Sequence, residues 1–108
     1  MFDINGSSIA ISREDTAVFT VTFDGDDIPE DGTAVILTVK PSLEKESSVI
    51  EKQLQIQDGQ IVIALNSEDT DLPPRHYYWD LRILYNNGEV FTPMQPGNFI
   101  IREVVGNV

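Results

Sequence analysis

Glycines that follow Asn or Asp divide this chain into short segments. Five of its seven glycines stand in such pairs. An Asn or Asp followed by Gly tolerates the positive φ angles of tight hairpin turns, so each pair is a candidate turn between two strands. The pairs are Asn5-Gly6, Asp24-Gly25, Asp31-Gly32, Asp58-Gly59 and Asn87-Gly88. A chain interrupted this often is predicted to fold from short strands rather than from long helices.

The segments between these turns are rich in Val, Ile, Thr, Phe and Tyr, and several alternate between two kinds of residue. From Tyr77 to Tyr85 the odd-numbered residues are apolar or aromatic, whereas Asp80 and Arg82 belong to the opposite set. A period of two with one polar face is typical of a half-buried antiparallel strand. Such strands are expected at Thr16–Phe23, Ser48–Gln57 and Tyr77–Tyr85, and further strands at Ser8–Ser12, Glu89–Thr92 and Asn98–Val104.

Two segments, Ala34–Lys40 and Ile61–Leu65, are apolar on both faces and are therefore expected as central strands. Only Ser67–Thr70 has helical character, because Asn66 or Ser67 can cap it and acidic residues fill its first turn. About eight short strands with one short helical turn predict an all-β antiparallel sandwich, with a barrel as the alternative. The 108 residues suit a single domain, residues 1–108, built around one core.

Composition excludes several classes of function. Cysteine is absent, which excludes a disulfide framework and thiolate metal sites. A formal net charge of −11 disfavours binding to nucleic-acid phosphates and to anionic membranes. No signal peptide is visible at the N-terminus, and no apolar run reaches the roughly 20 residues of a membrane helix. We therefore expect synthesis in the bacterial cytoplasm, with neither nucleic acid nor a membrane as partner.

Candidate residues for catalysis or metal binding are few. The acidic segment Asp24–Gly32 suggests a calcium loop, but Ile28 and Val35 occupy positions where an EF-hand needs ligands. A catalytic triad would have to use His76, the only histidine, with Asp80, and no Gly-x-Ser-x-Gly elbow is present. We predict no catalytic residue, no metal, no cofactor and no enzymatic activity. Cation binding by the acidic loop, and glycoside cleavage by paired carboxylates whose spacing the fold sets, stay open.

The run Tyr77, Tyr78 and Trp79 is the most distinctive local feature. Trp79 and Tyr77 fall in the apolar set of their strand, so we expect both in the core between two sheets. Tyr78 falls in the opposite set with Asp80 and Arg82, where an aromatic ring is either structural or an anchor for a ligand or a protein partner. Tyr78, Asp80 and Arg82 are therefore the candidate interface residues.

Short motifs follow one another in a characteristic order along most of the chain. They are Arg13–Thr16, Gly59–Leu65, Ser67–Thr70, Leu72-Pro73, Tyr77–Leu81, Gly88–Val90 and Gly97–Ile101. In their order and spacing, over residues 13 to 105, the chain resembles the N-terminal domain of the baseplate upper proteins of tailed phages that infect Gram-positive bacteria. The family has a glycine where this chain has Pro74, Arg75 and His76, so that turn must be built differently.

This resemblance implies an immunoglobulin-like sandwich of about seven to eight strands that acts as a non-catalytic docking domain of a phage or prophage tail or baseplate. The implied partners are other tail or baseplate proteins or further copies of the chain itself, a trimer included, and the implied location is the virion. Sheet edges or one sheet face would make the protein–protein contacts. The alternative interpretation is an immunoglobulin-like adhesion or carbohydrate-binding module.

Overall fold

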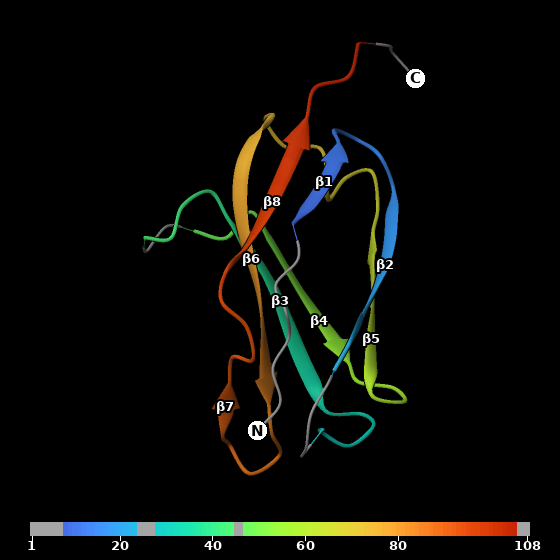
Figure 1. Ribbon diagram of the computed structural model, residues 1–108, viewed down its shortest axis with the longest axis vertical. Coiled ribbons are helices and arrows are strands. Elements are labelled where there is room, and N and C mark those ends of the chain that lie inside the picture. The colour runs from blue at the N-terminus through green and yellow to red at the C-terminus, as the bar shows by residue number, and fades with distance from the viewer. Residues whose placement is uncertain (1–7, 24–27, 45–46, 106–108) are drawn as a thin grey trace.

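The computed structural model describes residues 8–23, 28–44 and 47–105. This part of the chain forms eight strands and no helix (Figure 1). The strands are β1 (Ile9–Ser12), β2 (Ala17–Thr22), β3 (Ala34–Lys40), β4 (Ile50–Gln55), β5 (Gln60–Leu65), β6 (Arg75–Leu84), β7 (Val90–Phe91) and β8 (Gly97–Arg102). Every predicted strand is present, with ends that differ by at most two residues from those expected. Nothing in the described segments is a helix capable of crossing a membrane.

These strands form two sheets of unequal size. The larger has the order β1-β8-β6-β3-β4, with β7 paired to β6, and only the β1–β8 pair is parallel. The smaller consists of β2 and β5, paired antiparallel. The two sheets lie face to face (Figure 1) and make an immunoglobulin-like sandwich, which confirms the predicted fold class.

The two strands that are apolar on both faces, β3 and β5, were both expected at the centre of a sheet, and only one of them lies there. β3 lies between β6 and β4, which confirms the central position predicted for Ala34–Lys40. The same prediction for Ile61–Leu65 is wrong, since β5 pairs only with β2 among the described residues. The inward residues of β5 are buried, whereas Val62 is 51% exposed. An exposed valine needs no covering layer, so apolar residues on both faces do not by themselves indicate a central strand.

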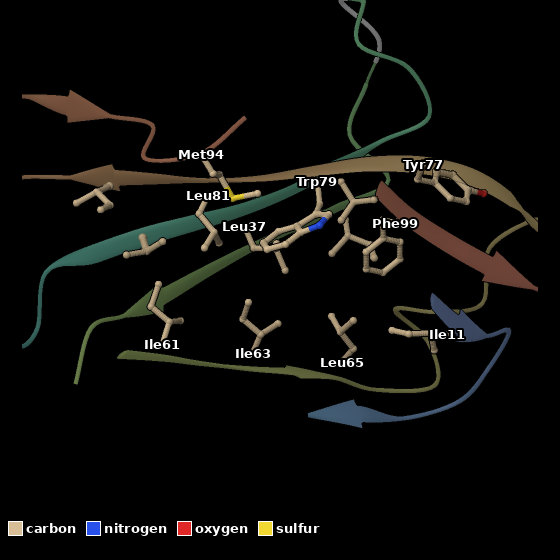
Figure 2. Close-up of a cluster of buried hydrophobic side chains, with 14 of the residues drawn as sticks. Ile11, Leu37, Ile61, Ile63, Leu65, Tyr77, Trp79, Leu81, Met94 and Phe99 are labelled. Carbon is tan, nitrogen blue, oxygen red and sulfur yellow. The ribbon is translucent and has the colours of Figure 1, made fainter. Parts of the chain in front are cut away.

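The core lies between the inner faces of the two sheets. Figure 2 shows Ile61, Ile63 and Leu65 of the smaller sheet facing Leu37, Trp79 and Leu81 of the larger one. Trp79 is only 3% exposed, and its ring meets that of Phe19 edge to face at 6.3 Å between centroids. Tyr77 is 2% exposed, and its hydroxyl donates a 2.7 Å hydrogen bond to the carbonyl of Pro73. Burial raises the pKa of Tyr77, and the core positions predicted for both aromatic residues are confirmed.

One predicted turn has the geometry that its sequence demands. Asp58 and Gly59 both have positive φ angles, 52° and 71°. On either side of them, the backbone groups of Gln57 and Gln60 exchange hydrogen bonds of 2.9 and 3.0 Å. Two residues of positive φ between a bridged pair make a tight hairpin turn, for which Asp-Gly is a preferred sequence. This turn leads the chain from β4 in the larger sheet to β5 in the smaller one.

The segment after β5 begins with a hydrogen-bonded turn at residues 66–70. The side chain of Asn66 accepts a 2.9 Å hydrogen bond from the backbone N–H of Asp69, and the carboxylate of Asp69 accepts one of 2.9 Å from the N–H of Asn66. Such reciprocal bonds are those of a capping box. Thr70 N–H also reaches the Asn66 carbonyl, at 3.3 Å. The helical turn predicted at Ser67–Thr70 is therefore one hydrogen-bonded turn that does not extend into a helix.

Two contacts anchor this turn to the sandwich. Lys52 Nζ lies 2.7 Å from Asp69 Oδ2, which explains why a lysine stands in the inward-facing set of β4. Thr70 is fully buried, and its Oγ1 donates a 2.7 Å hydrogen bond to the carbonyl of Asp15, just before β2. The N–H of Glu14, which has a φ of 68°, donates to the Thr70 carbonyl at 3.3 Å. The turn thus fixes the start of β2 relative to the end of β5.

Candidate functional site

The three candidate interface residues lie together on the outer face of the larger sheet. Tyr78, Asp80 and Arg82 alternate along β6 with the buried residues of the core. Tyr78 and Asp80 are half-buried, and Arg82 is exposed. Their shared face follows from the period of two predicted for this strand. That they form an interface stays a prediction.

Strand pairing brings residues of two further strands beside them. On β3, Lys40 lies opposite Tyr78 and Thr38 lies opposite Asp80. On β4, Glu51 lies opposite Thr38 on its other side, so that Glu51 and Asp80 flank this threonine. Directly opposite residues of neighbouring strands have Cβ atoms about 5 Å apart, which is contact distance for polar side chains.

This part of the sheet face is hollowed. The hollow has a volume of about 510 Å³. Its floor is made of sheet residues, Ile36, Thr38, Lys40, Glu51, Tyr78, Asp80 and Arg82, and its rim of loop residues, Ser42, Leu43, Ser48 and Pro96. Arg75 fastens the start of the β3–β4 loop, because its guanidinium donates a 3.0 Å hydrogen bond to the carbonyl of Pro41. We call this depression the outer hollow.

Charges in the outer hollow are close together but not paired. Burial raises the pKa of Asp80 above its ordinary value, although the positive charges of Arg82 and Lys40 act to lower it. Within the described part of the chain, no ion pair or hydrogen bond engages the side chains of these three residues. Glu51 accepts a 3.2 Å hydrogen bond from the hydroxyl of Ser48. The outer hollow therefore combines two free cationic groups with a free, partly desolvated carboxylate.

A second polar row continues from Tyr78 across β6 and β8. The rings of His76 and Tyr78 lie 4.7 Å apart between centroids at an interplanar angle of 33°. His76 Nε2 is 2.7 Å from Asn98 Oδ1, and the amide of Asn98 donates a 3.3 Å hydrogen bond to Ser8. His76 is exposed, and Tyr78 stands between it and Asp80 along the strand. These contacts hold the histidine beside an asparagine and a tyrosine ring rather than beside the aspartate that a triad would use.

The acidic segment that suggested a calcium loop is described only in part. Residues 24–27 lie outside the described residues. Farther along, the carboxylate of Asp31 accepts a 2.9 Å hydrogen bond from the N–H of Asp58, an ordinary contact between turns. Within the described ranges, no group of three or more His, Cys, Asp or Glu side chains is placed to hold a metal ion.

Sequence reasoning identified one strand of the outer hollow and missed the other two. Lys40, Thr38 and Glu51 belong to segments whose strands were predicted correctly, and each falls in the set that points away from the core. The missing information was which strands are neighbours of β6. Leu43, 67% exposed at the rim, lies in a loop that gave no sequence signal beyond its polarity.

Comparison with known proteins gives a match of fold only. No family model matches the chain, and no curated protein matches it either. Among solved structures, the chain is similar to CopC from Methylosinus trichosporium OB3b. The TM-score is 0.55 at 13% sequence identity, and the match covers 100% of this chain and 99% of CopC. An identity this low supports the shared sandwich fold and no shared activity.

This comparison corrects the function drawn from the family resemblance. The sequence motifs predicted a docking domain of a phage tail or baseplate. CopC, a solved structure that aligns with the whole chain, is not such a component, so this functional prediction is wrong. The motifs that suggested it mark strands and turns, and unrelated sandwiches share these. The resemblance to baseplate upper proteins itself stays a prediction, since no family model matches the chain.

Proposed function

We propose that this chain is a non-catalytic binding module that takes a neutral, hydroxyl-rich ligand, an oligosaccharide, in the outer hollow. The observation on which this rests is the half-buried carboxylate of Asp80, which stands unpaired between the free cationic groups of Lys40 and Arg82. Polar side chains that lie together on a sheet without hydrogen-bonding to one another can still donate or accept hydrogen bonds with a ligand.

The mixture of charges selects the kind of ligand. A simple anion attracted by Lys40 and Arg82 would meet the carboxylates of Asp80 and Glu51 in the same hollow. A simple cation would meet the two basic groups. A sugar carries no charge, and each of its hydroxyls both donates and accepts hydrogen bonds. It can therefore donate to the carboxylates while it accepts from the lysine and the guanidinium.

The shape of the site agrees with this ligand class. Along β6, Tyr78 to Arg82 spans about 13 Å, long enough for a short oligosaccharide. Tyr78 adds an aromatic ring with a polar tip, and Leu43 and Pro96 add apolar contacts at the rim. An open hollow on a sheet face admits a chain from the side, with no need for the ligand to have a free end.

Two carboxylates in one sugar site raise the question of hydrolysis. Glu51 and Asp80 lie on strands separated by β3, so their backbones are about 10 Å apart. Glycosidases place such a pair on either side of the scissile bond, inside a cleft that restricts water. Here both groups stand on the floor of an open sheet face. We therefore expect bound oligosaccharides to keep their chain length during incubation with the protein.

Affinity electrophoresis tests the proposal. The protein is run through native gels that contain xylan, galactomannan, laminarin or soluble starch, with polygalacturonate as an anionic comparison. We expect at least one neutral polysaccharide to retard the protein, and Tyr78→Ala and Asp80→Asn to weaken this binding about tenfold or more, which corresponds to about 1.4 kcal/mol. Gln55→Ala, on the exposed edge strand outside the outer hollow, is the control and should bind normally.

Absence of retardation by all four neutral polysaccharides would contradict the proposed ligand class. Retention that survives both variants would place binding elsewhere on the protein. Shortening of oligosaccharides during incubation, followed by chromatography, would show that the module is catalytic instead.

A further inference from the structure

Beyond Arg82, the outer face of the larger sheet becomes apolar. The next outward residue of β6 is Leu84, which pairs with Ala34 of β3 on one side and with Val90 of β7 on the other. Val90 is 55% exposed. None of these three side chains can form a hydrogen bond. A hydroxyl-rich ligand in the outer hollow therefore gains no hydrogen bond from them by extending in this direction.

Beyond Tyr78, at the opposite end of the outer hollow, the same face stays polar. The next outward residue of β6 is His76, whose ring lies 4.7 Å from that of Tyr78 between centroids, at an interplanar angle of 33°. Asn98 of β8 lies opposite Tyr78, on the side away from Lys40. His76 and Asn98 are both exposed. The surface that ends the outer hollow thus continues onto two further side chains with polar atoms.

Hydrogen bonds hold these two side chains in place before any ligand binds. His76 Nε2 lies 2.7 Å from Asn98 Oδ1, and the Asn98 amide donates a 3.3 Å hydrogen bond to Ser8 Oγ. A carbonyl oxygen only accepts, so Nε2 carries the proton of the neutral ring and Nδ1 is left as an acceptor. The amide of Asn98 keeps a second N–H as a donor. Groups fixed in this way lose little freedom on binding, which favours affinity.

An acceptor and a donor side by side suit a sugar hydroxyl, which can donate to one and accept from the other. The ring of Tyr78, continued by that of His76, provides an aromatic surface between this pair and the outer hollow. We propose that the oligosaccharide site extends along β6 beyond Tyr78 to His76 and Asn98, a proposal that rests on the sugar-binding function given above. The ligand then lies lengthwise on this strand.

The length of the ligand distinguishes the extended site from the outer hollow alone. The strand rises about 13 Å from Tyr78 to Arg82 and about 20 Å from His76 to Arg82. A trisaccharide can occupy the outer hollow, whereas a hexasaccharide also reaches His76 and Asn98. We therefore expect a hexasaccharide to bind about tenfold or more tightly than a trisaccharide of the same sugar. Part of this gain arises because a longer chain can bind in several registers, and that part does not depend on His76 or Asn98.

Isothermal titration calorimetry with oligosaccharides of two lengths tests this inference. The pairs are xylotriose and xylohexaose, mannotriose and mannohexaose, laminaritriose and laminarihexaose, and maltotriose and maltohexaose, one pair for each neutral polysaccharide of the gels. The measured quantity is the ratio of hexasaccharide to trisaccharide affinity. We expect Asn98→Ala and His76→Phe each to lower this ratio about fivefold, because each removes hydrogen bonds to the longer ligand. His76→Phe keeps a ring beside Tyr78, which preserves the end of the outer hollow.

Gln55→Ala is the matched control for Asn98→Ala. It also removes an exposed side-chain amide from the outer face of the larger sheet. Gln55 pairs with Ala34, which pairs with Leu84, so it lies at the opposite end of the sheet face from His76. The affinity ratio of this variant should equal that of the wild-type protein. Circular dichroism verifies that all variants fold.

Equal affinity of the wild-type protein for both lengths, or a ratio unchanged in both Asn98→Ala and His76→Phe, would overturn the extended site and leave the proposed function intact. An equal loss for both lengths in these variants would also overturn it, since the two residues would then act only by holding Tyr78. Tyr78→Ala should weaken binding of both lengths, which separates these results from a failure of the proposed function. If the wild-type protein bound none of the oligosaccharides, the proposed function would be wrong and the extended site with it.

Discussion

The outer faces of the two sheets differ far more than their inner faces do. On the larger sheet the outer face is hollowed and holds Lys40, Asp80 and Arg82, which leave one another unpaired. On the smaller sheet the exposed set of β2 and β5 contains only uncharged residues, such as Val18 and Val62. Apart from Lys52, both inner faces are apolar, and they close on one core. The sandwich is stabilised from within, which leaves its two outer faces free to diverge in chemistry.

The two sheets also differ in how far each can stand alone. The larger contains six strands, the smaller only two. A two-stranded antiparallel pair is marginally stable by itself in water, so β2 and β5 depend on packing against the larger sheet. Trp79 provides part of that packing through its edge-to-face contact with Phe19. We therefore expect core substitutions in the larger sheet to unfold the smaller sheet before the larger one.

Replacing this tryptophan should have the largest effect. Trp79→Ala removes a side chain that is 3% exposed and leaves a cavity between the sheets, so we expect a loss of about 3–5 kcal/mol in the free energy of unfolding. Urea denaturation measures it. Amide hydrogen exchange should show that protection falls in β2 and β5 before it falls in β3 and β6.

Trp79→Phe is the matched control, because it keeps an aromatic ring against Phe19 and should lose less stability. If protection decreased uniformly in both sheets of the alanine variant, the dependence of the smaller sheet on the larger one would be wrong. The sandwich would then unfold as a single cooperative unit.

A hydrogen bond from Thr70 anchors the start of β2, and removing it should have an intermediate effect on stability. Thr70→Val removes the hydroxyl that donates a 2.7 Å hydrogen bond to the carbonyl of Asp15. The threonine is fully buried, but Asp15 is exposed and the bond is only partly buried, so we expect its loss to cost about 0.5–1.5 kcal/mol. Thermal or urea unfolding measures the loss. Thr70→Ser keeps the hydroxyl and should recover most of it; a valine variant as stable as wild type would show that the bond contributes nothing.

The sequence predicted which residues face inward much better than it predicted which strands are neighbours. The period of two placed Trp79 and Tyr77 in the core and Tyr78, Asp80 and Arg82 outside, because burial alone decides that alternation. It could not bring Lys40 or Glu51 to Asp80, since strand order and register depend on contacts between distant segments. The outer hollow was therefore predictable along β6 and not across the sheet.

The two wrong predictions have related causes. β5 was expected at the centre of a sheet because both its faces are apolar, yet an apolar outer face such as that at Val62 is tolerated in the open. The phage docking function was inferred from turn and strand motifs that specify a sandwich, and a sandwich specifies no function. In both cases a pattern that fixes local structure was extended to long-range or functional properties that it does not determine.

The smallest expected effect is a change in stability at Asp80, which we propose as a ligand-binding residue on the outer face of the larger sheet. Burial raises the pKa of Asp80, so its charged form is disfavoured in the folded protein. Between the ordinary pKa and the raised one, the folded chain binds more protons than the unfolded chain, and stability therefore falls as pH rises through the raised pKa.

At neutral pH the wild-type protein bears the full cost of the buried charge, which Asp80→Asn removes. The asparagine variant should thus be more stable at pH 7 by less than about 1 kcal/mol, because the carboxylate is only half-buried and solvent screens it. The difference should shrink towards pH 3, where Asp80 is protonated in both states. Urea denaturation of both proteins at the two pH values measures it. A variant less stable than wild type at pH 7 would mean that Lys40 and Arg82 already stabilise this carboxylate, and the main support for a ligand in the outer hollow would be lost.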